Sequence, residues 1–171
     1  MPGRLPEDLA AAGIATADVA AIVLTHLHSD HVGWALPGWT PFPHARVVVQ
    51  RADVEAFAAA RGDDLLAEPD RLHVLDGDAD LGPGVRAVAT PGHTPGHQCV
   101  LVSAADERML ISGDLFVHAV QLLDPELAYR YDADADQGRV TRRALLREAG
   151  AASASWLAPS HLGEPFWRTG K

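Results

Sequence analysis

The sequence of 171 residues contains one cysteine, Cys99, and comparatively few positive charges. A single cysteine can form no disulfide within the chain, so stability does not depend on an oxidising compartment, and we expect Cys99 to be a small buried residue in a strand. The chain has 14 Lys and Arg against 23 Asp and Glu, a net charge of −9 with histidine neutral. The basic residues are scattered except for Arg142, Arg143 and Arg147, which argues against a nucleic-acid partner.

The sequence also lacks long apolar runs. No run approaches the roughly 18 residues that a membrane span needs, and the start MPGRLPEDLAAAG has no continuous apolar core of the signal-peptide type. We therefore expect no membrane association and a cytoplasmic location. With 47% hydrophobic residues the chain can bury a sizeable core, and no repeat or low-complexity linker interrupts it, so residues 1–171 are expected to form one domain.

Predicted strands and helices are interleaved along the chain, which is typical of an α/β or α+β domain. Thr16 or Asp18 is expected to cap the second helical segment, and Asp134 or Asp136 lies near the start of the last one. Helical segments are predicted over 5–12, 16–20, 52–60 and 141–149. Strands are predicted over 21–24, 46–50, 72–75, 85–89, 98–103, 109–112 and 156–158, with turn residues around 37–38 and a hairpin joining 98–103 to 109–112.

Side chains of the metal-binding type follow four of the predicted strands. Loops at strand ends are where a rigid scaffold presents polar groups to a cleft, and a random scatter of histidines would rarely produce this pattern. The candidates are His26, His28, Asp30 and His31 in THLHSDHVG, His93 in TPGH, Asp114 in SGD and His161 in PSH.

The spacing within THLHSDHVG suits two adjacent cations. In an irregular loop after a strand, His26 and His28 can point the same way toward one cation, while Asp30 and His31 turn toward a second. Imidazole and carboxylate ligands without thiolate favour Zn²⁺ and also admit Mn²⁺, Fe or Co²⁺. Sharp backbone turns beside these ligands are expected at Gly33, Gly92, Gly96 and Gly113.

The remaining histidines receive other interpretations. His44 and His73 have no partner motif, so we expect them to be ordinary surface or core residues. His97, four residues after His93, is better explained as a group that holds the loop geometry than as a ligand. For His118, lining the pocket and packing in the interior are equally favoured.

The motifs HLHSDH, TPGHTPGH, SGD and PSHLG, in this order, resemble the metallo-β-lactamase-fold hydrolase superfamily. The resemblance covers about residues 14–168. It implies an α+β fold, an αββα sandwich with a dinuclear metal site at one edge of two facing sheets. By the same resemblance, the first metal would be bound by His26, His28 and His93, the second by Asp30, His31 and His161, and Asp114 would bridge the two.

Within the superfamily, GDLFVHAVQ and WTPFPHARVVVQRADVEAF resemble the branch of the quorum-quenching lactonases and methyl parathion hydrolase. Some lactonases carry a tyrosine where this chain has Val117, and Tyr129 or Tyr131 could instead reach the pocket from the following loop. The aromatic residues expected to wall an apolar pocket are Trp34, Trp39, Phe42 and Phe116, although core packing explains Phe116 equally well.

Members of the superfamily usually have a substantial segment before the first metal motif, whereas 25 residues precede His26 here. Part of the first sheet is therefore expected to be missing, so the sandwich would be incomplete in its N-terminal half. We favour a truncated chain. The alternative is a second chain, as in a homo-oligomer, that covers the exposed sheet edge.

The expected site predicts a reaction. Two cations about 3.5–4 Å apart can share a water, lower its pKa from about 16 toward neutrality and generate hydroxide at pH 7. The chain is thus predicted to be a dinuclear metal-dependent hydrolase whose hydroxide attacks a lactone or ester-type small molecule. Asp30, which can carry a proton to the leaving group, and Asp114 are the predicted catalytic residues.

Two alternatives stay open. A thioesterase of the glyoxalase II type shares the metal motif and would need basic residues for a glutathione carboxylate, for which the end of the chain offers Arg168 and Lys171. A non-catalytic metal-binding module is the other, if the missing N-terminal part is essential.

Overall fold

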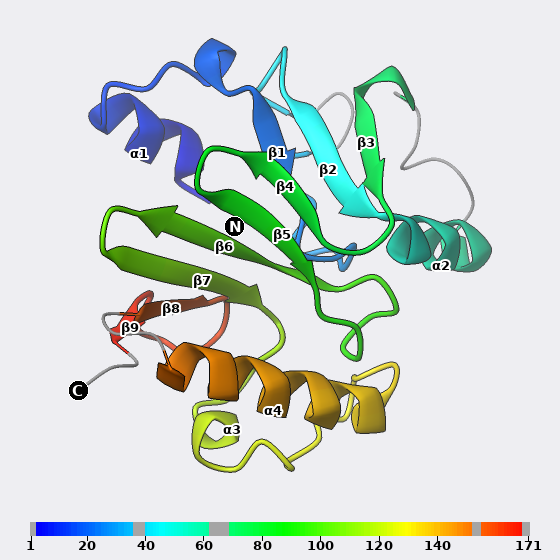
Figure 1. Cartoon of the computed structure of the whole chain (residues 1–171). Coiled ribbons are helices and arrows are strands. Elements are labelled where there is room, and N and C mark those ends of the chain that lie inside the picture. The colour runs from blue at the N-terminus through cyan, green and yellow to red at the C-terminus, as the bar shows by residue number, and fades with distance from the viewer. Residues whose placement is uncertain (1–2, 36–39, 62–68, 152–154, 169–171) are drawn as a thin grey trace.

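The computed structural model describes residues 3–35, 40–61, 69–151 and 155–168, and shows two β-sheets with helices on their outer faces (Figure 1). Sheet A is parallel, in the order β1 (Ala21–Val23), β2 (Arg46–Gln50) and β3 (Leu72–Leu75). Neighbours in sheet B are antiparallel except for the parallel pair β7 and β8. Sheet B follows chain order: β4 (Ala79–Gly82), β5 (Val85–Ala89), β6 (Gln98–Ala104), β7 (Glu107–Gly113), β8 (Ser155–Pro159) and β9 (Trp167–Arg168).

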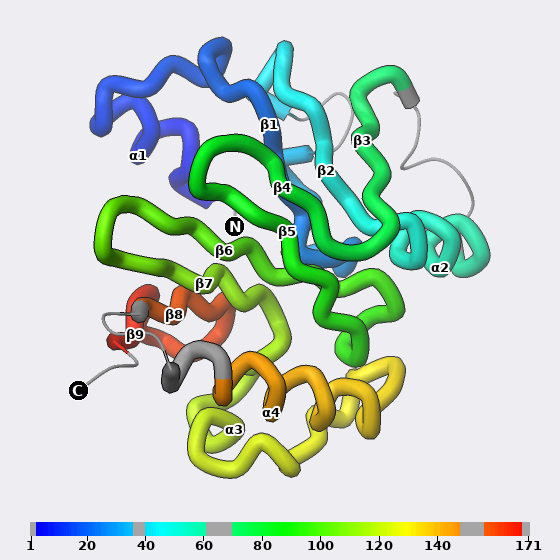
Figure 2. The backbone as a smooth tube through the Cα atoms, viewed as in Figure 1, coloured from blue at the N-terminus to red at the C-terminus, as the bar shows by residue number. Residues whose placement is uncertain are grey.

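The helices lie between and beside these strands. Helix α2 follows β2 directly, and α3 and α4 form the long excursion between β7 and β8. The backbone tube shows β8 and β9, in orange and red, returning to the side of green β7 after this excursion (Figure 2). The helical elements are α1 (Leu5–Ala11), η1 (Thr16–Asp18), α2 (Arg51–Arg61), η3 (Pro69–Arg71), α3 (Val120–Leu123) and α4 (Ala135–Ala151).

Alternating side chains of β2 separate two apolar layers. On one face of sheet A, Val47 and Val49 pack with Val54 and Phe57 of α2. Val48 points to the opposite face and packs with Ala87 of sheet B. Successive residues of a strand face opposite sides, so a run of valines can fill both layers at once. Sheet A is therefore covered by α2 on one face and by sheet B on the other.

The outer face of sheet B is covered by α4. Cys99, Leu110 and Leu157, from β6, β7 and β8, pack with Leu145 of the helix. The layers are thus α2, sheet A, sheet B and α4, which confirms the predicted αββα sandwich. Cys99 is fully buried in β6, as predicted.

A buried amide pair joins the two sheets where the candidate site begins. Gln50 Nε2 donates to Gln98 Oε1 at 2.9 Å, and Gln98 Nε2 donates to the carbonyl of Leu24 at 2.7 Å. The backbone N–H of Gln98 also donates to the carbonyl of Thr25 at 2.8 Å. These bonds hold the loop after β1 against the start of β6.

Most predicted elements are confirmed within a residue or two. The predicted bounds of β2, β3 and β5 are those observed, the β6–β7 hairpin is present, and α2 extends the predicted helix by one residue at each end. The expected turn around 37–38 and Trp39 lie outside the described residues.

Other predictions are wrong. The segment 16–20 is a shorter 3₁₀ turn without a side-chain cap, so neither Thr16 nor Asp18 caps it. Helix α4 begins at Ala135, six residues before the predicted start; the expectation of Asp134 near its start is confirmed, since the Asp134 side chain accepts the backbone N–H of Gln137 at 2.9 Å. The predictions omit β4, β9 and α3; β4 lies within the segment 76–84, whose Gly and Asp residues indicate a loop. No described helix is long and apolar enough to cross a membrane.

Candidate metal centre

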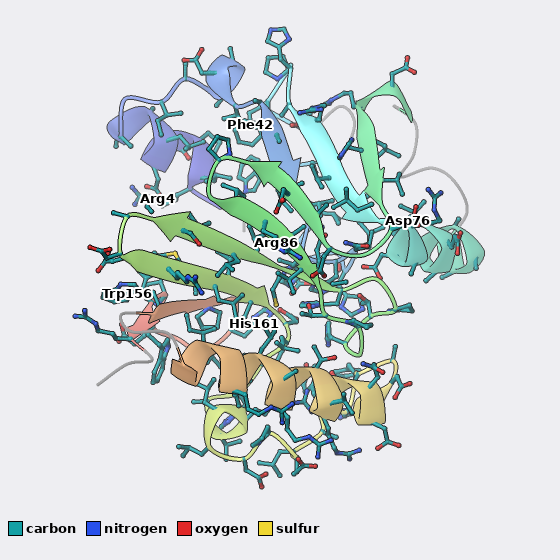
Figure 3. All side chains as sticks on the ribbon, in the orientation of Figure 1. Arg4, Phe42, Asp76, Arg86, Trp156 and His161 are labelled. Atoms are coloured by element: carbon teal, nitrogen blue, oxygen red, sulfur yellow. The ribbon has the colours of Figure 1, made fainter. Side chains whose placement is uncertain are left out.

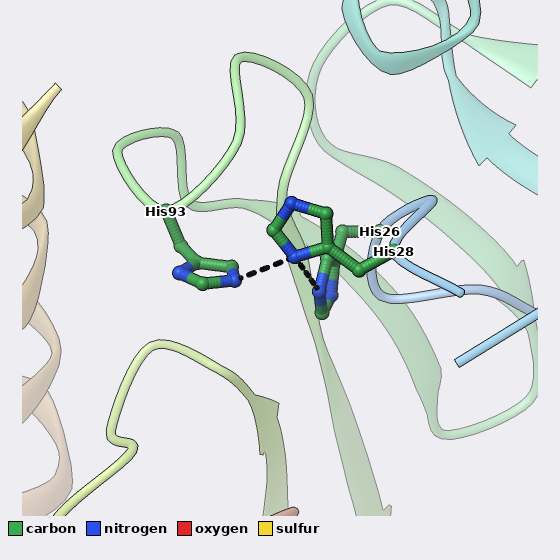
Figure 4. A group of neighbouring side chains, drawn as sticks. All are labelled: His26, His28 and His93. Carbon is green, nitrogen blue, oxygen red and sulfur yellow. Dashed lines mark hydrogen bonds between the residues drawn. The ribbon is translucent and has the colours of Figure 1, made fainter. Parts of the chain in front are cut away.

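Three histidine rings from two loops converge on one point. His28 Nδ1 lies 3.0 Å from His26 Nε2 and 3.0 Å from His93 Nε2 (Figure 4). A ring nitrogen carries either one proton or one lone pair, so His28 Nδ1 can make only one well-aligned hydrogen bond here. Ligand nitrogens of a tetrahedral zinc ion are about 3.3 Å apart, because each lies about 2.0–2.1 Å from the metal. The spacing therefore suits a shared cation.

A second group forms beside the first, nearer to solvent. Asp30 Oδ2 lies 3.5 Å from both His31 Nε2 and His161 Nε2, and the Asp30 side chain is 57% exposed. His161 comes from the loop after β8, about 130 residues further along the chain, and Figure 3 labels it. One ligand atom from each of these three residues lies within 4.8 Å of the other two, as in the first group.

Asp114 faces both groups at once. Its Oδ1 lies 3.2 Å from His31 Nε2 and 3.3 Å from His161 Nε2. Its Oδ2 lies 3.5 Å from His93 Nε2 and 3.9 Å from His26 Nε2. One carboxylate thus directs one oxygen to each group, and this is the arrangement that a bridging ligand requires.

Two buried atoms of this cluster lack a hydrogen-bond partner among the described residues. They are His31 Nε2 and Asp114 Oδ1, which lie 3.2 Å apart but are not aligned for a hydrogen bond with each other. A buried polar atom without a partner costs about 1–3 kcal/mol, so the arrangement is unfavourable unless something binds between them. Nitrogen and carboxylate oxygen donors without sulfur suit Zn²⁺ and related divalent ions, and the residues present therefore fit a metal centre.

The surroundings favour a neutral imidazole at His26 and an ionised carboxylate at Asp114; burial lowers the pKa of His31, but its contacts with Asp114 outweigh this and raise it. Burial, followed by the neighbouring His31 and His97, lowers the pKa of His26 to about 2. Burial alone would raise the pKa of Asp114, but its contacts with His31, His26 and His161 hold that pKa below its ordinary value. Metal ligands must be deprotonated, so the shifts of His26 and Asp114 keep these two groups in the binding form near neutral pH.

Comparison with known proteins assigns the chain to a family. A family model described as the Metallo-beta-lactamase superfamily matches residues 2–161. The chain belongs to this superfamily. The resemblance stated from the sequence motifs is therefore confirmed, and the curated matches place the chain near the lactonase branch.

Among these relatives, an N-acyl homoserine lactonase from a Bacillus species is 37% identical over 103 residues, which are 58% of this chain and 39% of that protein. The metallo-beta-lactamase domain-containing protein 1 of Xenopus laevis is 31% identical over 158 residues, 90% of this chain and 58% of that protein. The chain spans well under two thirds of both relatives.

Solved structures show the same fold. The crystal structure of the hydrolase AbOPH, of the beta lactamase superfamily, superimposes with a TM-score of 0.81 at 26% identity, covering 95% of this chain and 64% of that one. AidC, described as a dizinc quorum-quenching lactonase, superimposes with a TM-score of 0.80 at 23% identity and the same coverage.

All seven side chains that the sequence nominated are brought together in this superfamily member. The structure also adds residues that the sequence did not indicate. His93 Nδ1 lies 3.2 Å from Asp132 Oδ1, and Asp132 Oδ2 lies 3.5 Å from Arg142 Nη1. A carboxylate partner places the ring proton of His93 on Nδ1, so the lone pair of Nε2 points toward the cluster and is free to bind a metal. Asp132 lies 39 residues from His93, so no local pattern could have revealed the pair.

His97 holds the backbone of Asp114, as predicted. Its Nε2 accepts the Asp114 backbone N–H at 3.2 Å, which places the ring proton on Nδ1, 2.8 Å from Thr90 Oγ1. Burial first, and then the neighbouring His93, lower the pKa of His97 to about 3, so the ring is neutral. His118 neither lines the pocket nor packs in the interior. It is exposed, and its Nδ1 accepts the backbone N–H of Val120 at the start of α3.

The predicted glycine turns are partly correct. Gly92 and Gly113 have positive φ angles of 140° and 50°, and a Cβ on Gly113 would lie 2.7 Å from Thr25 Cβ. Gly96 is required by close approach, since a Cβ there would lie 2.4 Å from the backbone nitrogen of Asp53. Gly33 lies in a turn, as predicted, but a Cβ there would meet nothing within 4 Å, so lack of space does not require glycine at this position.

Two neighbouring cavities, which share lining residues, open onto the cluster. One, of about 340 Å³, is lined by candidate ligands together with Val117, Tyr129 and Tyr131, so the expectation that these tyrosines reach the pocket is confirmed. Tyr129 stacks on His93 with ring centroids 6.0 Å apart. We call this space the metal cavity. It is lined by His28, Asp30, His93, Asp114, Val117, Tyr129, Tyr131 and His161.

The other cavity, of about 380 Å³, runs along α2, and we call it the α2 cleft. Its apolar wall contains Leu27, Ala56, Phe57, Ala60 and Pro95, and it shares His28, Asp30, His93 and Tyr131 with the metal cavity.

The aromatic walls expected from sequence are not those observed. Phe116 packs in the core with Leu145 and Phe42 is also buried, so neither lines these cavities. Trp34 lies beside Gly3 and is likewise absent from both linings. All three lie outside the strands, in turns or irregular backbone, so their closeness to a motif in the chain does not fix where their side chains point.

Proposed function

We propose that this chain is a metal-dependent hydrolase domain that binds two divalent cations, with zinc the first choice, and opens small lactones or related esters. The observation that carries the proposal is Asp114, whose two oxygens face two separate groups of ligand atoms. His26, His28 and His93 would hold one cation, and Asp30, His31 and His161 the other. Two such cations, when bound, would supply a water of lowered pKa and polarise the scissile carbonyl.

The chain's own residues have distinct tasks in this proposal. Asp30 lies in the metal cavity and is more than half exposed, so its carboxylate can accept a proton from the attacking water and pass it to the leaving oxygen. Tyr129 and Tyr131 bear the only hydroxyl groups among the residues that line this cavity. Their phenols can donate a hydrogen bond to the substrate carbonyl or leaving oxygen, where charge develops in the transition state.

The shape of the site favours a substrate with an apolar tail. The metal cavity would receive the ring ester, and the α2 cleft continues from it past His28 and Tyr131 along an apolar wall. Burying a methylene group contributes about 0.8 kcal/mol, so a chain of several carbons would add binding energy there. The lactonase relatives are named for N-acyl homoserine lactones, which combine a small lactone with an acyl tail.

The thioesterase alternative receives less support from the described residues. Neither cavity lining contains a lysine or arginine that could bind a glutathione carboxylate. Arg168 instead lies over the Trp156 ring, with its Cζ 5.3 Å from the ring centroid, and Lys171 lies outside the described residues.

The test measures metal content and hydrolysis with the same preparations. We expect two equivalents of zinc per chain, and turnover of N-hexanoyl homoserine lactone that exceeds turnover of S-lactoylglutathione and of an aryl phosphate triester. His93→Ala and Asp114→Ala should each lower both metal content and turnover. Protein that binds two zinc ions and hydrolyses none of the lactones or esters would refute the hydrolase proposal. One equivalent of zinc per chain would refute the proposal that Asp114 bridges two cations.

A further inference from the structure

Asp53 is a buried carboxylate that sits outside the candidate ligand set. It is the third residue of α2, and its exposed fraction is 2%. A negative charge in the first turn of a helix is favoured by the helix dipole, but this alone does not explain burying a carboxylate beside a metal-binding cluster.

The carboxylate accepts three hydrogen bonds, and all come from the two ligand-bearing loops. Asp53 Oδ2 accepts the backbone N–H of Leu27 at 3.1 Å and the Thr94 hydroxyl at 3.0 Å. Asp53 Oδ1 accepts the backbone N–H of Gly96 at 2.6 Å. Leu27 lies between His26 and His28, while Thr94 follows His93. One side chain thus ties together the loops that present all three histidines of the first group.

The approach of the second loop to Asp53 also depends on Gly96. A Cβ on Gly96 would lie 2.4 Å from the Asp53 backbone nitrogen and 2.9 Å from its Cβ. The loop can therefore reach the carboxylate only because position 96 has no side chain. The hydrogen bonds and this close approach together hold the second loop against Asp53, which also binds the first loop at Leu27.

We propose that Asp53 is a positioning residue that sets the separation of His26 and His28 from His93 and thereby the affinity of the first metal site. The inference rests on the metal site proposed above. Metal–ligand distances vary by only about 0.2 Å, so a small displacement between the loops weakens binding strongly. Residues that orient metal ligands typically change metal affinity 10- to 100-fold when mutated.

The experiment measures zinc affinity by competition with a chelator, and follows the absorption of bound Co²⁺, whose bands report ligand geometry. Asp53→Ala should weaken the tighter zinc site about 10- to 100-fold and shift the Co²⁺ spectrum. Asp53→Asn retains an acceptor for Gly96 but sets an amide N–H against the Leu27 N–H, so its loss should be smaller than that of Asp53→Ala, which retains no acceptor. Thr94→Val removes one of the three bonds and should also give a smaller loss.

Asp76→Asn is the matched control. Asp76 is also an aspartate next to α2, ion-paired with Arg51 on the surface, and Figure 3 labels it beside the start of this helix. This variant should retain wild-type zinc affinity.

A second measurement distinguishes a loss of zinc affinity from a general loss of stability. Zinc that binds the folded chain raises the melting temperature in proportion to the logarithm of its affinity. Asp53→Ala should therefore show a smaller zinc-induced rise than the wild type, in addition to any loss in the metal-free protein. If Asp53→Ala does not fold, Asp53→Asn and Thr94→Val decide the question by the same two measurements.

The outcomes separate the two proposals. Folded variants with wild-type zinc affinity and an unchanged Co²⁺ spectrum would overturn the role of Asp53 and leave the metal site intact. Wild-type protein that binds no zinc would overturn the metal site itself, and this role with it.

Discussion

Removing the Asp132 carboxylate is expected to affect both the fold and the metal site. Asp132 and Arg142 are almost completely buried, with side-chain exposures of 0% and 1%, and their charged atoms are 3.5 Å apart. The other oxygen of Asp132 contacts His93 Nδ1. In Asp132→Ala, Arg142 keeps its hydrogen bonds to the carbonyls of Pro125 and Leu127 but loses its counter-charge.

The expected loss in free energy of unfolding follows from this geometry. Two unit charges 3.5 Å apart attract by about 5 kcal/mol at an effective dielectric constant of 20. Removing one partner of a buried pair typically costs about 3–5 kcal/mol, and the two retained carbonyl bonds reduce this, so we expect about 2–3 kcal/mol. For a chain of this size that corresponds to a fall in melting temperature of roughly 5–10 °C.

The assay is urea unfolding of the metal-free protein for Asp132→Ala, Arg142→Met and the double variant. Arg142→Met removes the charge that Asp132→Ala leaves unpaired, so the double variant should be more stable than the sum of the single losses predicts, by about 1–2 kcal/mol. Zinc affinity should fall about 10- to 100-fold in Asp132→Ala, because His93 loses the acceptor for its Nδ1 proton. Losses that add within about 0.5 kcal/mol, together with unchanged zinc affinity, would refute the proposed coupling.

Three further predictions concern Gly113, Asp132 and Cys99. Gly113→Ala should destabilise the chain by about 2 kcal/mol or more in urea unfolding, because its φ of 50° is unfavourable for alanine and the new Cβ would meet Thr25; a neutral effect would contradict this. Burial opposes ionisation of Asp132, yet its hydrogen bond to His93 and its other contacts hold its pKa below the ordinary value, so its stabilisation should be complete above about pH 5 and lost as pH falls through the lowered pKa. Asp132→Asn should flatten that acid-side loss in metal-free unfolding curves, and an unchanged curve would argue against it. Burial raises the pKa of the Cys99 thiol to about 12, so Ellman's reagent should label it only after unfolding, and rapid labelling of folded protein would be inconsistent with this environment.

Some features of this protein were determined by local sequence. The motif THLHSDHVG places four candidate ligands within six positions, so their proximity follows from chain connectivity alone. The strands β2, β3 and β5 were predicted at their observed bounds because each is an apolar run flanked by turn residues or a helix start. The order of the motifs along the chain was enough to predict the superfamily and the layered fold.

The tertiary structure decided the relations between segments. That Asp114 directs one oxygen to each ligand group depends on where β7 ends relative to β8 and to the loop after β1. The partners Asp53 and Asp132 lie 43 and 39 residues from the groups they contact, Gly96 and His93. A hydrogen bond between such distant residues leaves no period or spacing in the sequence, because it arises only when the packed sheets and helices bring the two loops together.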